Sequence, residues 1–86
     1  MSKDNHRRVQ RIQTGVRMEK RLVKVLKGLA EYHDITLGDL LEGIVLHALE
    51  GKAPFGEKSL AAIKDLRRVY GLDLNAADSH KLVEDP

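Results

Sequence analysis

One segment of this chain alternates between apolar and polar side chains, and no second segment does. The alternation covers residues 9–18 and is clearest in the run RIQTGVRM. A period of two indicates a β-strand with one apolar face and one cationic face. A lone strand leaves its backbone N–H and C=O groups unpaired, so we expect it to pair with the same strand of a second chain. The pattern therefore predicts a two-stranded antiparallel ribbon shared by two copies.

Three helices are predicted after this strand, because apolar residues then recur at helical spacing. The first is expected to start at Glu19 and to end before a left-handed turn at Asp34. The second is expected to begin at an N-cap formed by Thr36 and to stop at Gly51. The third is expected to run from about residue 58 to the next glycine, Gly71.

The second helix carries apolar side chains around most of its circumference, so it must be buried on more than one side. One partner helix cannot cover that much apolar surface. Together with the unpaired strand, this predicts an intertwined homodimer that is mainly α-helical with one β-strand per chain. The dimer core is expected to be built from Ile12, Val16, Met18, Leu22, Leu26, Leu40, Leu41, Ile44, Val45 and Leu49.

Basic residues are concentrated in the first part of the chain. The 86 residues hold 15 Lys and Arg against 13 Asp and Glu, a net charge of +2. Residues 1–31 hold nine basic and three acidic side chains, or +6, whereas residues 32–86 hold six and ten, or −4. A basic part joined to a mildly acidic part predicts a surface that binds a polyanion.

The composition also excludes several kinds of function. The chain has no cysteine, which excludes disulfides and thiolate chemistry, and no apolar run approaches the ~20 residues of a membrane span. Its four histidines have no metal-ligand spacing, and no catalytic constellation is recognisable. We therefore expect a cytoplasmic protein that is not an enzyme and that uses no metal and no cofactor.

The strand and the first two helices resemble the ribbon-helix-helix family of bacterial repressors, of the Arc and methionine repressor type. The resemblance covers about residues 9–51 without gaps, in RIQTGVRM for the strand and in EKRLVKVLKGLAEYHD and TLGDLLEGIVLHALEG for the helices. The chain is thereby divided into a flexible basic arm (residues 1–8), a DNA-binding and dimerisation domain (residues 9–51) and a helical C-terminal extension (residues 52–86).

In that family the paired strands enter the DNA major groove, so the resemblance implies that the outward strand positions contact bases. Arg can donate to guanine and Gln to adenine, whereas a glycine has no side chain to read a base. The base-reading residues implied are Arg11, Gln13, Gly15 and Arg17. Nearby basic side chains and the N-terminal end of the second helix are expected to bind phosphates. These residues are Arg7, Arg8, Lys20, Arg21, Thr36, Leu37 and Gly38.

The resemblance implies a prokaryotic transcriptional repressor that binds specific sequences of double-stranded DNA as a homodimer, or as two dimers on adjacent half-sites. Two alternatives stay open: an antitoxin whose C-terminal part binds a toxin, and a helical dimer that serves only as a protein-interaction scaffold. The resemblance to the methionine repressor also offers the C-terminal extension as a binding place for a small-molecule effector. Its apolar stripe of Leu60, Ile63, Leu66 and Tyr70 predicts a helix packed on its own domain, which favours the repressor over the antitoxin.

Overall fold

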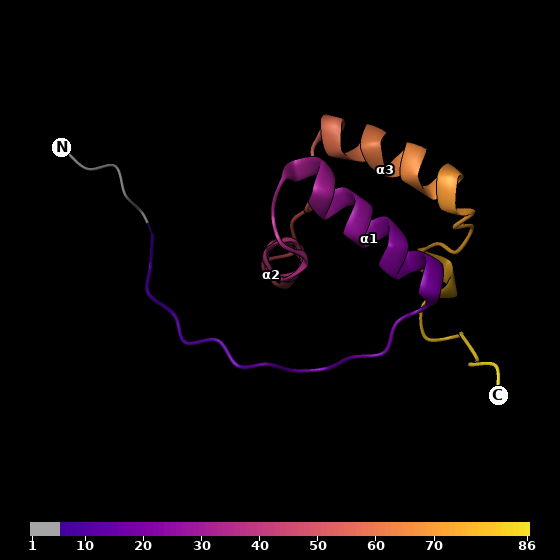
Figure 1. Ribbon diagram of the computed structural model, residues 1–86, viewed down its shortest axis with the longest axis horizontal. Helices are drawn as coiled ribbons and strands as arrows, with labels where there is room; N and C mark the ends of the chain where they lie inside the picture. Colours follow the sequence, from indigo (N-terminus) through magenta and orange to yellow (C-terminus); the bar gives the residue numbers. More distant parts are fainter. Residues whose placement is uncertain (1–5) are drawn as a thin grey trace.

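The computed structural model describes residues 6–86, and its regular structure is helical throughout (Figure 1). An extended segment leads into the first helix, and a tail without regular structure ends the chain. The elements in chain order are α1 (Lys20–His33), α2 (Leu37–Leu49), α3 (Glu57–Tyr70) and the 3₁₀-helix η1 (Ala76–Asp78).

Side chains and left-handed turns set the ends of α1 and α2, much as the sequence predicts. The carboxylate of Glu19 accepts a hydrogen bond from the amide of Leu22 at 2.9 Å and so caps α1. Asp34 ends α1 in the left-handed conformation, with φ at 57°. The hydroxyl of Thr36 accepts from the amide of Asp39 at 3.0 Å and caps α2. The predicted caps at Asp34 and Thr36 are confirmed.

Glycines in the left-handed conformation follow α2 and α3. Gly51 has a φ of 72° and Gly71 a φ of 66°. A residue without a Cβ adopts this conformation at no steric cost, which explains glycine at both ends. The predicted stop of the third helix at Gly71 is therefore confirmed, and α3 begins at Glu57, one residue before the predicted start.

The hydrophobic core lies where α1 packs on the other two helices, more extensively on α3 than on α2 (Figure 1). Leu29 of α1 is the most deeply buried side chain, with 1% of its surface exposed. Ile63 and Leu66 of α3 pack against this core, so the third helix packs on its own domain through two residues of the predicted stripe. The other two, Leu60 and Tyr70, are exposed. The fully buried apolar residues are few: Val25, Leu29, Ala30, Leu40 and Leu72.

The predicted β-strand and the ribbon-helix-helix fold are wrong for this structure. Residues 6–19 are extended but form no strand, and no strand occurs anywhere between residues 6 and 86. The apolar side chains that were expected in a dimer core here are open to solvent, with Ile12 87% and Val16 72% exposed. Alternation only determines which side chains share a face; it supplies no hydrogen-bonding partner, and the helices of the same chain offer none. All of the regular structure between residues 6 and 86 is helical.

Two further predictions concern the N-terminal arm and membrane-spanning segments. The predicted flexible arm of residues 1–8 lies partly outside the described residues, which begin at His6. No helix within residues 6–86 has the length and apolar character needed to cross a membrane.

Candidate functional site

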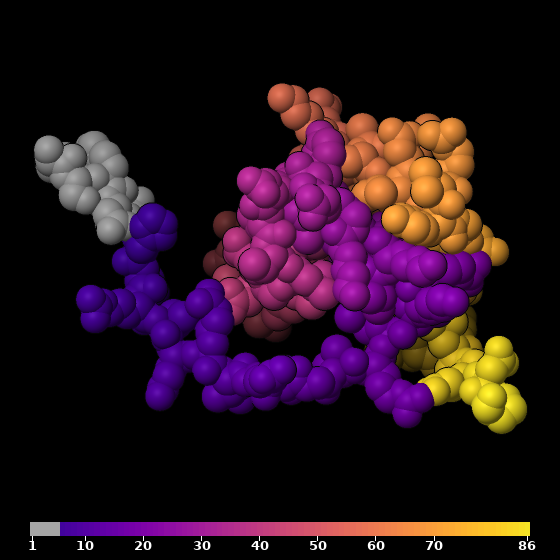
Figure 2. Space-filling view, viewed as in Figure 1, coloured from indigo at the N-terminus to yellow at the C-terminus, as the bar shows by residue number. Residues whose placement is uncertain are grey.

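The most distinctive surface is the basic segment, which we define as residues 6–21. It holds six basic side chains and one acidic one, or +5. Residues 6–18 are all exposed, and the segment stands apart from the helical body over much of its length (Figure 2). Its positive charges therefore face solvent on more than one side.

Arg11 in the middle of the segment is held by a carboxylate of α2. Its Nε and Nη2 atoms donate to the two carboxylate oxygens of Glu42, both at 2.9 Å. The hydrogen bond from Arg11 lowers the pKa of Glu42, and the same contact raises the pKa of Arg11. Both side chains stay substantially exposed, at 67% and 45%. The pair therefore has favourable bidentate geometry, but water screens the attraction between the two charges.

Arg17 is paired with the far end of the chain through one guanidinium nitrogen instead of two. Its Nη2 atom donates to Glu84 in the C-terminal tail, and both side chains are well exposed. The two arginines implied as base-reading residues thus each contact a carboxylate of the acidic part of the chain. Sequence reasoning missed these partners, although the separation of +6 from −4 was a signal that such contacts would form.

The other two residues implied to read bases, Gln13 and Gly15, are exposed and form no hydrogen bond within residues 6–86. A Cβ built on Gly15 would meet no atom within 4 Å, and the residue does not have a positive φ. Neither a close contact within the chain nor the backbone conformation thus explains the glycine at this position.

The predicted phosphate-binding residues fall into two groups. Arg7, Arg8 and Lys20 are exposed and form no ion pair within the described part of the chain. Arg21 instead has three partners: its Nε donates to Glu19 at 3.1 Å, and its Nη1 lies 2.8 Å from the carbonyl of Gly71 and 3.1 Å from Asp73. Arg21 therefore ties the start of α1 to the end of α3.

The N-terminal end of α2 carries the remaining predicted residues. Thr36 uses its hydroxyl for the cap, Leu37 is half-buried, and Gly38 is exposed. Asp39 in the same turn lies close enough to act electrostatically on Arg11. The end of this helix thus lies beside the basic segment, but it also carries a carboxylate that opposes the binding of an anion.

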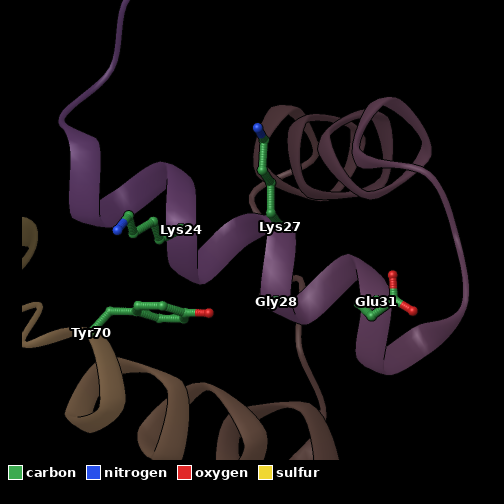
Figure 3. Close-up of a pocket in the computed structure, with 5 residues that line it drawn as sticks. All are labelled: Lys24, Lys27, Gly28, Glu31 and Tyr70. Atoms are coloured by element: carbon green, nitrogen blue, oxygen red, sulfur yellow. The ribbon is translucent and has the colours of Figure 1, made fainter.

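A shallow groove between α1 and α3 is the other candidate (Figure 3). Lys24 lies over the ring of Tyr70, with its Nζ atom 5.8 Å from the ring centroid, whereas Lys27 points away from that ring. Glu31 closes the far end of the groove. The groove is open, and no unpartnered polar side chain is buried in it. Within residues 6–86, no three His, Cys, Asp or Glu side chains come together to hold a metal ion.

Comparison with models of known protein families, with curated proteins and with solved structures finds no match to this chain.

Proposed function

We propose that this protein binds double-stranded DNA through its basic segment and represses transcription by occupying its site. The observation that carries the proposal is a charge of +5 on residues 6–21, of which residues 6–19 are extended and residues 6–18 are exposed. Neutralising DNA phosphates releases condensed counterions, and this term dominates the affinity of basic surfaces for DNA.

The extended backbone suits this role without any secondary structure of its own. Extended arms that carry arginines follow DNA grooves and reach base edges there. Arg7, Arg8 and Lys20 have no partner among the described residues and are assigned to phosphates. Arg11, Gln13 and Arg17 are assigned to base edges, because guanidinium and amide groups donate to guanine and adenine.

The proposal includes a homodimer formed through α2. The exposed face of this helix carries Val45, Leu46 and Leu49, which are 51%, 64% and 79% exposed. These residues recur at helical spacing with Glu42, so they share one face of α2. Because Arg11 contacts Glu42, this apolar face lies next to the basic segment.

We assign a second copy of the chain as the partner of that face. Large apolar side chains left exposed together on one helix face are typical of an interaction surface. A dimer also brings two basic segments to one duplex, and this linkage strengthens binding.

The test is a salt titration of DNA binding, followed by fluorescence anisotropy. If about six phosphates are contacted per dimer, affinity falls by about a thousandfold between 50 and 200 mM salt. Selection of bound sites from random duplexes should then yield a preferred sequence. The double variant R11Q/R17Q should weaken binding and reduce that preference. The control K58Q/K64Q removes the same charge from α3 and should leave the preference unchanged.

Two outcomes would contradict parts of the proposed function. A dimer that binds no duplex DNA at low salt would contradict the proposal and favour a protein-interaction scaffold. Binding that is equal for wild type and R11Q/R17Q on every sequence would mean that the segment does not read bases.

A further inference from the structure

We propose that Glu42 and Glu84 restrain DNA binding by holding Arg11 and Arg17 in the DNA-free protein. This inference rests on the DNA binding proposed above. It adds a regulatory contact within the chain, in which carboxylates of the acidic part occupy the donors that DNA would use.

Glu42 binds one edge of the Arg11 guanidinium. Its two oxygens accept from Nε and Nη2 of Arg11, both at 2.9 Å. The same edge of a guanidinium holds a phosphate or the edge of a guanine, because each presents two acceptors at matching spacing. A carboxylate and a DNA acceptor cannot occupy these donors together, so Glu42 competes with DNA for this edge of Arg11.

Glu84 contacts Arg17 from the opposite end of the chain. It lies in the tail of residues 79–86, which has no regular structure and is exposed throughout. Figure 1 shows this tail below the start of α1, close to where the basic segment joins the helix. The pair with Arg17 is the one ion pair that joins the described tail to the rest of residues 6–86. The tail is thus positioned as a competing anion within the same molecule.

The restraint is weak enough to be reversible. Both pairs are exposed, and exposed ion pairs contribute little because water and salt screen them. Removing either carboxylate should therefore tighten DNA binding by about two- to fivefold, and removing both by about the product. The gain should shrink at high salt, since the same screening weakens the restraint.

The experiment measures the Kd of wild type, E42Q, E84Q and E42Q/E84Q for the same duplex at two salt concentrations. The matched control is D65N, which breaks the exposed Arg68–Asp65 pair on α3 and makes the same change in net charge. We expect each glutamine variant to bind more tightly than D65N. A second comparison uses the R11Q background, where E42Q should no longer tighten binding because its partner is absent.

A measurement without DNA keeps the inference separate from the function on which it rests. The side-chain Nε–H signal of Arg11 in an ¹⁵N NMR spectrum should move in E42Q, while that of Arg21, which donates to Glu19, serves as the internal reference. If wild type binds DNA and the variants match D65N, the restraint is refuted and DNA binding stands. If neither wild type nor any variant binds DNA, the proposed function fails and this inference fails with it.

Discussion

Gly28 of α1 lies so close to Leu66 of α3 that a Cβ at residue 28 would stand 2.8 Å from Cδ2 of Leu66. A glycine in a helix interior costs roughly 1 kcal/mol relative to alanine, so its presence needs a reason. The reason is the crossing of α1 and α3, which form the most extensive helix contact in the structure. The absence of a side chain at residue 28 lets the two helices approach.

Substitution of Gly28 by valine should therefore destabilise the fold. The branched side chain would displace Leu66 and separate α1 from α3, at a cost of about 2 kcal/mol in the free energy of unfolding. Gly43→Val on α2 is the matched control, because a Cβ at Gly43 meets no atom within 4 Å. Urea unfolding at one protein concentration checks this. Equal stability of the two variants would show that the helix crossing does not require Gly28.

Lysine in place of Leu46 or Leu49 should convert the proposed dimer into monomers. Each substitution places a charge in the middle of an apolar interface, where it has no partner. Sedimentation equilibrium should then give 9.7 kDa instead of twice that mass. Leu60→Lys on α3 is the control, because Leu60 is also exposed, at 53%, but lies outside the proposed interface. A wild-type protein that sediments as a monomer at high concentration would refute the dimer.

Acid should weaken the cap of α1. Partial removal of Glu19 from water raises its pKa, but the amides of Leu22 and Arg21 and the guanidinium of Arg21 outweigh this, so the net pKa is lowered from 4.5. A lowered folded-state pKa means that the stabilisation is complete above the unfolded value and is lost as pH falls through the folded value. The difference in Tm between wild type and Glu19→Gln should be largest near pH 6 and should shrink as the pH falls below 4.5. A difference that stays constant as the pH is lowered would mean that the charge of Glu19 is not the stabilising feature.

The helices were predictable because their ends are determined by neighbouring residues. Thr36 bonds to an amide three residues away, and the left-handed turns at Asp34 and Gly71 depend on the residue at the turn itself. The strand was predicted wrongly because pairing is not local. The period of two within residues 9–18 identifies side chains on one face but not what the backbone bonds to.

The contacts of the basic segment could not be predicted from the sequence, because they too are not local. Arg11 and Glu42 are 31 positions apart, and Arg17 and Glu84 are 67 apart, so no spacing rule connects them. Arg21 shows the opposite case. The sequence suggested a phosphate contact for Arg21, whereas the fold surrounds its guanidinium with Glu19, Gly71 and Asp73. Charge segregation indicated that opposite ends of the chain attract each other but not which side chains would meet.

The order of the helices has a consequence for how the chain folds. The best-packed pair, α1 and α3, is separated in sequence by α2, so residues 34–56 must close as a loop before that pair forms. Loop closure costs entropy, but the cost grows only slowly with the length of the loop. We expect α1 and α3 to dock first, and the less tightly attached α2 to gain its full protection from hydrogen exchange only when a second chain arrives. The last step of folding would then be bimolecular, and its rate would rise with protein concentration.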